Sequence, residues 1–401
     1  MKRNHFYSAI LLCLVPFLFS CTSTVKKVTP ESVGLSGDTL EIAAQKMQEY
    51  VDNGEFAGIT SLVFKNGEMV HRQNVGLAGL INPKPLDDQT IFRIFSMSKP
   101  VTAVALMTLY DEGKFQLDDK VSKFIPEFAE TQVYNAETKI LEPQVNELTI
   151  RHLLTHTSGI PYGWDQTAYV DSLYRVTGVG GWDGTSGEKV KALAQLPLKN
   201  QPGTKWEYGL SIDVAGYLVE VLSGTPLDVY MKTKIFDPLK MNDTGFFVPE
   251  EKLSRFSGLF SLRADSLVEM EGGMGAAFKN PVTLFSGGGG LVSTASDYLT
   301  FCKMLLNGGE LDGARIISEA ATQLIMSNQL PEGLVYAENK GYGLAGEVNL
   351  ETGVYGWAGA ASTKFWIDKN NQMIVSTFAQ RMPAEYSYAD EFYSIVSSGL
   401  Q

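Results

Sequence analysis

The chain has 401 residues, 44% of them hydrophobic, so it has enough apolar material to bury a large core. Its 45 acidic residues outnumber its 33 basic residues, which gives a formal net charge of −12 at pH 7. Because proteins that bind nucleic acids need basic patches to meet the phosphates, this acidity argues against a nucleic-acid partner.

The first twenty residues have the pattern of a targeting segment rather than of a folded element. Lys2 and Arg3 give a positive start, and an apolar stretch runs from Phe6 to Phe19. That stretch is too short for a comfortable membrane span, so we predict a signal peptide over residues 1–20.

The end of this stretch, Leu18-Phe19-Ser20-Cys21, resembles a bacterial lipobox, although Phe19 is bulkier than the residue usual there. We therefore predict that Cys21 is lipidated and that residues 21–33 form a polar tether. The lipid would anchor the protein to a membrane of the bacterial cell envelope, on its periplasmic or surface side. An ordinary secretory signal and an uncleaved anchor are the alternatives.

Cysteine usage leaves no intrachain disulfide in such a mature chain. Cys13 lies inside the signal peptide and Cys21 would carry lipid, so Cys302 is the one remaining thiol. It lies in an apolar helical pattern over residues 298–305, with no histidine near it in sequence. We expect a buried structural residue rather than a nucleophile.

Hydrophobic periodicity and turn residues divide the rest of the chain into strands at both ends and helices between them. The predicted elements are a helix over 40–54, a hairpin over 58–78 around Asn66-Gly67, a helix from Ser96 to Gly113, short helices and loops over 115–200, two helices over 213–240, strands over 341–380 and a helix over 384–399. This order favours an α/β fold in which an antiparallel sheet built from both termini is flanked by helices. We place one domain at 34–401, with a mainly helical subdomain at roughly 114–200.

Ser96 and Lys99 carry the first chemical signal. A serine and a lysine three residues apart share one face of a helix, with about 5–6 Å between their Cβ atoms, and a buried lysine can help to remove the proton of the serine. The Ser-x-x-Lys pattern starts at Ser23, Ser96 and Ser186. Only Ser96 follows a strand-like apolar run and opens a helix. For this motif alone, a surface serine and lysine at a helix start is the alternative.

Other hydrolase signatures are missing from the sequence. It has no Gly-x-Ser-x-Gly, His-Glu-x-x-His or Gly-x-x-x-x-Gly-Lys-Ser/Thr motif, which argues against an α/β-hydrolase, a zinc hydrolase and a P-loop protein. We expect neither a metal nor a cofactor. For His156 we expect a structural hydrogen bond rather than a role as base, and for Gly287–Gly290 tight backbone packing near a strand.

Tyr208 is the next candidate catalytic residue. It lies in the loop of residues 202–211, just before a predicted helix, where its hydroxyl can project freely. A lysine ammonium beside it would favour the phenolate form, which could act as a general base. A core tyrosine is the alternative for an isolated residue of this type.

These motifs resemble the serine β-lactamase and penicillin-binding-protein superfamily, and most closely its class C β-lactamase-related branch, which includes esterases and D-aminopeptidases. The resemblance extends from about Gly34 to the C-terminus. It rests on blocks that occur in the order of the family, at 92–100, 116–128, 148–161, 202–220, 235–246, 287–298 and 356–368. It implies a β-lactamase/transpeptidase-like fold and acyl transfer through a serine.

The resemblance also assigns roles to individual residues. It implies that Ser96 is the acylated nucleophile, that Lys99 activates it and that Tyr208 is the partner of the lysine. Trp357-Ala358-Gly359 takes the place of the Lys-Thr-Gly strand of the family. The backbone N–H groups of Ser96 and Ala360 would form the oxyanion hole.

Two departures from the family pattern bear on the substrate. Leu210 stands where the second motif has an asparagine that holds a substrate amide, and Trp357 stands where the third has a lysine that meets a substrate carboxylate. We therefore expect a small-molecule ester or amide substrate and a carboxylesterase-type activity. Substrate contacts are expected from Leu210, Trp357, Gly359 and Ala360.

Aromatic residues of the 160–185 loop, such as Tyr162 and Trp164, would add apolar surface to this pocket. A D,D-peptidase, a D-aminopeptidase or a class C-like β-lactamase is the alternative among enzymes. A non-catalytic sensor module that keeps the fold is the alternative outside them.

Overall fold

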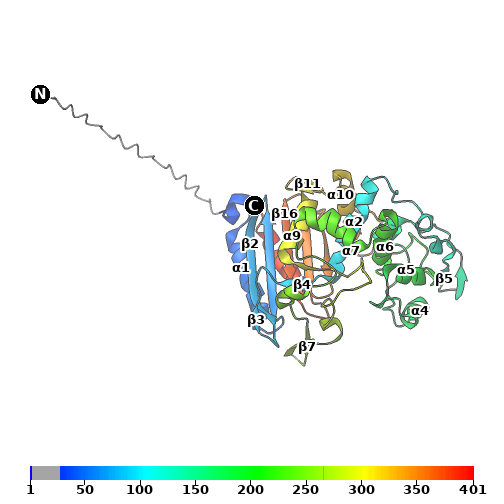
Figure 1. Ribbon diagram of the computed structural model, residues 1–401, viewed down its shortest axis with the longest axis horizontal. Helices are drawn as coiled ribbons and strands as arrows, with labels where there is room; N and C mark the ends of the chain where they lie inside the picture. The colour runs from blue at the N-terminus through cyan, green and yellow to red at the C-terminus, as the bar shows by residue number, and fades with distance from the viewer. Residues whose placement is uncertain (2–27, 265) are drawn as a thin grey trace.

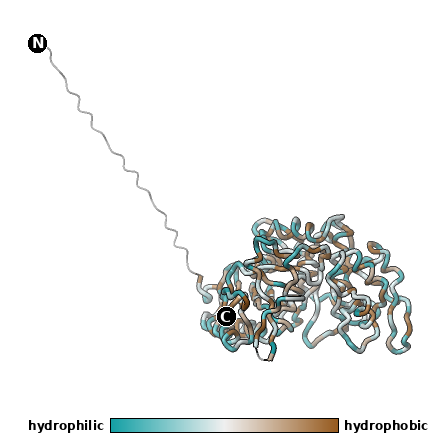
Figure 2. The backbone as a smooth tube through the Cα atoms, turned by 60° about the horizontal axis from the view of Figure 1, so that its bottom comes forward, coloured by the Kyte–Doolittle hydropathy of each residue, from teal (hydrophilic) through white to brown (hydrophobic). Residues whose placement is uncertain are grey.

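The computed structural model describes Met1, residues 28–264 and residues 266–401 (Figure 1). The predicted signal peptide beyond Met1, the lipidation site at Cys21 and the tether up to residue 27 lie outside the described residues. Within the described part of the chain, no helix is both long and apolar enough to span a membrane. The two ends of the folded body meet, because Leu35 pairs with Leu400 (Figure 2).

An antiparallel sheet of eight strands joins both ends of the chain, as predicted. Its order is β12-β13-β14-β15-β16-β1-β2-β3, and Thr60 of β1 lies opposite Phe378 of β16. The strands are β1 (Gly58–Lys65), β2 (Glu68–Gly79), β3 (Lys84–Pro85), β12 (Lys340–Tyr342), β13 (Glu347–Asn349), β14 (Tyr355–Gly359), β15 (Thr363–Asp368) and β16 (Met373–Phe378). Both central strands, β1 and β16, are buried along their whole length because helices cover both faces.

The predicted hairpin turn connects β1 to β2. Asn66 and Gly67 have positive φ angles of 49° and 89°, which a two-residue hairpin turn requires and which Asn and Gly tolerate.

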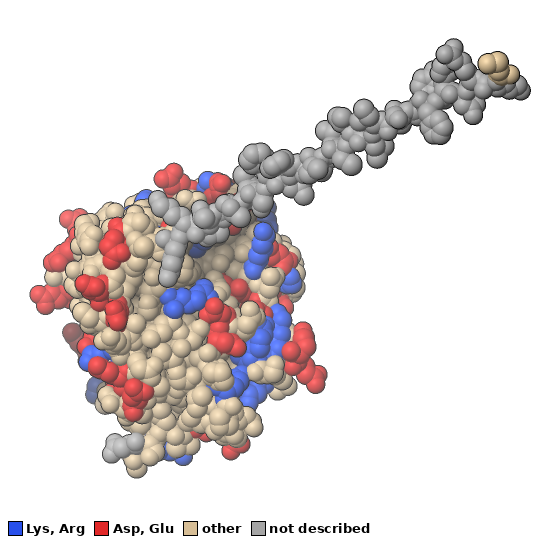
Figure 3. All heavy atoms as spheres, turned by 90° about the vertical axis from the view of Figure 1, so that its left-hand side faces the viewer, with Lys and Arg blue, Asp and Glu red and all other residues tan. Residues whose placement is uncertain are grey.

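Helices cover the two faces of the sheet (Figure 1). The helices are α1 (Gly37–Asp52), α2 (Ser98–Asp111), α3 (Ile150–Leu154), α4 (Tyr169–Thr177), α5 (Ser186–Ala194), α6 (Ser211–Ser223), α7 (Leu227–Met231), α8 (Asp237–Leu239), α9 (Ala295–Leu306), α10 (Glu319–Met326) and α11 (Ser387–Ser398). We call the face covered by α1 and α11 the outer face, where Met47 and Phe392 pack with Val63. Acidic and basic side chains lie intermingled on the side of the molecule drawn in Figure 3.

The opposite, inner face packs on α9, and α2 belongs to the same hydrophobic core. All residues of α2 from Ser98 to Leu109 are buried, as expected for a helix enclosed on all sides. Residues 114–200 contain α3, α4, α5 and a small hairpin of β5 (Val133–Asn135) and β6 (Ile140–Glu142), at the end of the molecule away from β1 (Figure 1). Cys302 is buried in α9, and burial raises the pKa of its thiol well above the ordinary value.

His71 on β2 gives the stability of the fold a pH dependence. Burial lowers the pKa of His71 to about 4, and its Nε2 lies 2.9 Å from Ser61 Oγ. Because the pKa of histidine in an unfolded chain is about 6.5, the unfolded state binds a proton that the folded state excludes between about pH 6.5 and 4. The corresponding stabilisation is present above pH 6.5 and is lost as the pH falls through this window.

We expect His71→Gln to lose less of its free energy of unfolding than the wild type between pH 7 and pH 4.5. Glutamine can still hydrogen-bond Ser61 but does not titrate, and His152 and His156 remain in both proteins. Urea unfolding at a series of pH values measures the difference, and parallel losses in the two proteins would refute it.

Candidate active site

Ser96 lies at the junction between strand β4 (Ile91–Arg93) and helix α2. β4 pairs with β9 (Val292–Thr294), and a single 3₁₀ turn follows before α2 begins. Phe95, directly before the serine, has a φ of +39°, a left-handed conformation that strains a bulky residue. Its buried ring packs edge-to-face on Phe278. Core packing thus holds the sharp turn that places Ser96 at the start of the helix.

Lys99 is fully buried one turn after Ser96. Its Nζ donates hydrogen bonds to Ser96 Oγ at 3.1 Å, to the Tyr162 hydroxyl at 3.0 Å and to the Gly288 carbonyl oxygen at 2.6 Å. An ammonium group has three N–H donors, so these three acceptors occupy all of them. The amine is therefore fixed in one orientation, in direct contact with the oxygen of the serine.

Tyr208 contacts the same serine oxygen. The hydroxyl oxygens of Tyr208 and Ser96 lie 2.7 Å apart, and Lys99 Nζ lies 4.7 Å from the centre of the Tyr208 ring. The structure thus brings together the three residues that the sequence motifs indicate, although Tyr208 is 112 positions from Ser96. Ser96 Oγ thus has two neighbours that can take its proton, Lys99 when it is the neutral amine and Tyr208 when it is the phenolate.

His156 is a structural neighbour of this cluster. It is fully buried, and its Nδ1 lies 2.9 Å from Ser211 Oγ at the start of α6. Burial, with a smaller effect of the nearby Lys99, lowers the pKa of His156 well below its ordinary value. Its neutral ring packs at 4.7 Å from the ring of Tyr208, so it orients that tyrosine, in agreement with the structural role predicted for it.

The glycine run at 287–290 packs as tightly as predicted. A Cβ atom on Gly288 would lie 2.5 Å from a carboxylate oxygen of Asp213, and one on Gly287 would lie 2.7 Å from the Ile212 carbonyl oxygen. Ser286 donates a hydrogen bond to Asp213 at 2.6 Å. This packing holds the Gly288 carbonyl against Lys99, a function that the sequence did not indicate.

The residues assigned to the substrate site fall into two groups. Trp357 and Ala360 line the cavity above Ser96, whereas Leu210 is buried in the core at the start of α6. Gly359 is not part of the lining. A Cβ there would lie 2.3 Å from the Ile94 carbonyl oxygen, so this glycine lets β14 approach the turn that follows β4. The structure therefore does not place Leu210 or Gly359 against a substrate in the cavity.

The oxyanion hole that the sequence motifs predict would use two backbone N–H groups. Among the described residues, neither the N–H of Ser96 nor that of Ala360 is hydrogen-bonded to a backbone acceptor in a turn or loop. Donors of this kind, fixed before the reaction, stabilise the negative charge that develops on a carbonyl oxygen.

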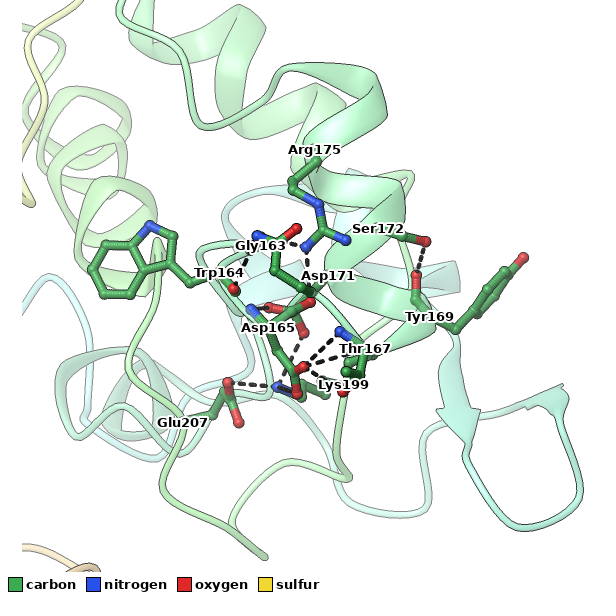
Figure 4. A network of polar contacts seen from close by, with 12 residues as sticks. Gly163, Trp164, Asp165, Thr167, Tyr169, Asp171, Ser172, Arg175, Lys199 and Glu207 are labelled. Carbon is green, nitrogen blue, oxygen red and sulfur yellow. Dashed lines mark hydrogen bonds and ion pairs between the residues drawn. The ribbon is translucent and has the colours of Figure 1, made fainter.

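A partly buried ionic network holds the loop that carries Tyr162 and Trp164 (Figure 4). Lys199 Nζ lies 3.0 Å from both Asp171 and Glu207, the residue just before Tyr208. Arg175 on α4 donates to the carbonyl oxygens of Gly163 and Asp165 at 2.7 and 2.8 Å. The network links the Tyr162 loop to the Tyr208 loop, which fixes both tyrosines relative to Lys99.

The cavity above Ser96 has a volume of about 770 Å³. Most of the side chains that line it are aromatic or small. The lining residues are Ser96, Trp164, Trp206, Tyr208, Glu347, Asn349, Thr352, Val354, Gly356, Trp357, Ala358, Ala360, Lys364, Trp366, Tyr386, Tyr393 and Ser397. This volume lies within the range of small-molecule sites.

Residues 43–398 match the protein family described as Beta-lactamase. The chain belongs to the beta-lactamase family. Protein Rv1367c of Mycobacterium tuberculosis is 30% identical over 362 residues, which cover 84% of this chain and 89% of the relative. Esterase EstB of Burkholderia gladioli is 32% identical over 259 residues, 60% of this chain and 64% of the relative.

Solved structures share the fold, which confirms the predicted architecture. EstCE1, a hydrolase with promiscuous acyltransferase activity, has a TM-score of 0.76 at 24% identity and covers 90% of this chain and 98% of its own. The octameric penicillin-binding protein homologue from Pyrococcus abyssi has a TM-score of 0.68 at 23% identity. That match covers 90% of this chain and 77% of the chain of the homologue. This beta-lactamase family member is a serine hydrolase, with Ser96, Lys99 and Tyr208 in mutual contact.

Tyr162 is a functional residue of this beta-lactamase family site that the sequence did not reveal. The sequence indicates only an aromatic residue of the pocket wall. Burial, with smaller effects of Tyr208 and Asp213, raises the pKa of Tyr162 well above its ordinary value. Its hydroxyl therefore stays protonated and accepts a hydrogen bond from Lys99. Its ring stacks on Trp164 at 4.3 Å.

We expect Tyr162→Phe to lower kcat/KM for a small ester by about 10- to 100-fold. The ring packing is kept, but one N–H of the buried Lys99 ammonium loses its acceptor, which costs about 1–3 kcal/mol. Steady-state kinetics measure the effect, with Tyr169→Phe, on the exposed side of α4, as the matched control. Wild-type kinetics in the Tyr162 variant would contradict this role.

Proposed function

We propose that this protein hydrolyses small, uncharged carboxylic esters through an acyl-enzyme on Ser96. The observation that carries the proposal is the neutral, aromatic-lined cavity above the serine. Trp357 stands in it at the position where the family motif has a lysine, and the lysine in the outer part of the lining, Lys364, lies 2.5 Å from Asp390. A substrate carboxylate would find no unpaired cation there, whereas an uncharged ester finds apolar surface.

Acylation of Ser96 begins with loss of its proton to the Lys99–Tyr208 pair, either to Lys99 as the neutral amine or to Tyr208 as the phenolate. The serine Oγ then bonds to the ester carbonyl carbon, and the negative charge moves to the carbonyl oxygen, where the N–H groups of Ser96 and Ala360 stabilise it. As the intermediate collapses, the bond to the alcohol oxygen breaks and the pair returns the proton to that oxygen.

Release of the acyl group repeats these steps with water. The Lys99–Tyr208 pair takes a proton from a water molecule, whose oxygen bonds to the acyl carbon. The bond to Ser96 Oγ then breaks, the proton returns to the serine, and the carboxylic acid leaves. His156 and Tyr162 hold the pair in place throughout.

A substrate panel tests the proposal. The folded protein should hydrolyse p-nitrophenyl acetate and butyrate, and a fluorophosphonate probe should label it and block that activity. A protein that is labelled but turns over a cephalosporin or a D-Ala-D-Ala peptide faster than any ester would favour the β-lactamase or D,D-peptidase alternative. Folded protein that takes no label and cleaves no substrate would favour the non-catalytic sensor module.

We also propose that a lipid on Cys21 anchors the enzyme to a membrane of the bacterial cell envelope. The support is the short apolar stretch that ends in Ser20-Cys21. Full-length protein should incorporate labelled fatty acid and sediment with membranes, and Cys21→Ser should do neither. Equal labelling of both proteins would refute the anchor.

A further inference from the structure

The cavity above Ser96 continues around the edge of strand β14 onto the outer face of the sheet. β13 pairs with β14 only at Glu347 opposite Gly356 and Val348 opposite Tyr355, so the later residues of β14 form a free edge in the described structure. The cavity lining includes residues from both sides of this edge. It thus extends well beyond the reacting atoms.

Strand register shows which lining residues share the outer face. Gly356 of β14 lies between Glu347 of β13 and Trp366 of β15, and Ala358 lies opposite Lys364. Residues directly opposite in neighbouring strands point to the same face. We call this part of the cavity the outer groove; its residues are Glu347, Asn349, Thr352, Val354, Gly356, Ala358, Lys364, Trp366, Tyr386, Tyr393 and Ser397.

The outer groove has a low floor and an aromatic wall. Gly356 and Ala358 form the floor, and a Cβ on Gly356 would lie 2.3 Å from the Phe365 carbonyl oxygen, so only glycine fits there. Trp366 stacks on Tyr393 of α11, with 4.7 Å between ring centres and 14° between planes. A flat ring can lie against such a wall over a floor of small residues.

The charges of the outer groove are paired within the protein. Lys364 Nζ lies 2.5 Å from Asp390, and Glu347 accepts from Lys340 at 2.9 Å and from the Tyr336 hydroxyl at 2.5 Å. A charged ligand group would have to displace one of these partners. The groove therefore suits an uncharged occupant.

The outer groove is also long. Val354 lies four positions before Ala358 in the chain, a distance of about 13 Å at the rise of an extended strand. A p-nitrophenyl or acetyl group at Ser96 would leave it empty.

We propose that the outer groove binds the far end of one arm of the substrate, an extended uncharged chain that ends in an aromatic ring. The inference rests on the proposed ester hydrolysis at Ser96 and adds the substrate class. The ring lies against Trp366 and Tyr393, and the chain crosses the free edge of β14 to reach the reacting carbonyl.

Kinetics with short and long substrates test this inference. p-Nitrophenyl 8-phenyloctanoate, which extends the acyl arm, is compared with p-nitrophenyl acetate. 8-Phenyloctyl acetate, which extends the alcohol arm, is compared with butyl acetate, which also releases a primary alcohol. Wild-type kcat/KM should be at least tenfold higher for one of the long esters than for its short counterpart. Ser397→Trp, which fills the far end, and Trp366→Ala, which removes the wall, should each lower this ratio at least tenfold.

Ser398→Trp is the matched control, because Ser398 is the exposed neighbour on the same helix and does not line the groove. If Ser397→Trp does not fold, Ser397→Leu takes its place. Wild-type hydrolysis of p-nitrophenyl acetate without any preference for a long ester, or a ratio that neither groove variant changes, would overturn the outer groove while leaving ester hydrolysis intact. Failure to cleave any of the four esters would overturn both.

Discussion

Replacing Lys99 with methionine should lower kcat/KM for p-nitrophenyl acetate by about 10³-fold or more. General-base assistance of a positioned side chain contributes about 10²–10⁴-fold to such reactions, and Lys99 also positions Tyr162 and Gly288. Methionine fills nearly the same buried volume without a charge, so the variant should still fold. Its melting temperature should be lower than that of the wild type, because the Tyr162 hydroxyl and the Gly288 carbonyl lose their N–H donor.

Steady-state kinetics and thermal unfolding of the same preparations measure both expectations. Tyr208→Phe is the companion variant, because it removes the other group in contact with Ser96 Oγ and keeps the ring. Since the two groups act as one unit, the double variant should lose little more activity than the worse single variant. A folded Lys99→Met protein with activity within tenfold of the wild type would contradict the role of the lysine.

Ser96→Ala should abolish ester turnover, with a loss of at least about 10⁴-fold, because no other hydroxyl can take the place of the nucleophile. The change removes one oxygen from the site and leaves the strained turn at Phe95 intact, so the fold should be unaffected. The p-nitrophenyl ester assay measures the loss. Ser98→Ala is the control; Ser98 Oγ accepts a hydrogen bond from the N–H of Leu291 and lies in the core. Activity retained in Ser96→Ala would show that another residue carries the chemistry.

Much of the fold could be predicted from sequence because its signals are local. The Asn66-Gly67 turn, the apolar strands at both ends and the closing helix each follow from residues close together in the chain. Ser96 and Lys99 could also be found locally, because an i, i+3 spacing on a helix places both side chains together.

Other features of the site depend on contacts between distant segments. Tyr162 and the Gly288 carbonyl meet Lys99 across 63 and 189 positions, and nothing in their own sequence surroundings marks a ligand for an ammonium group. Leu210 was assigned to the substrate by its place in a motif, but at the start of α6 its apolar side chain packs into the core. The outer groove arises because β13 is shorter than β14 and leaves part of its edge uncovered. The alternation of apolar and polar residues along a strand does not reveal how far the neighbouring strand extends.

Mass analysis of the acylated protein tests the central claim most directly. Wild-type protein is treated with a slowly released ester, a penicillin and a fluorophosphonate, and intact mass is followed by peptide mapping. We predict one adduct per chain from the fluorophosphonate and from the ester, on the peptide that contains Ser96, and none on Ser96→Ala. An adduct on another residue, or no adduct on folded wild-type protein, would contradict the assignment of Ser96 as the nucleophile.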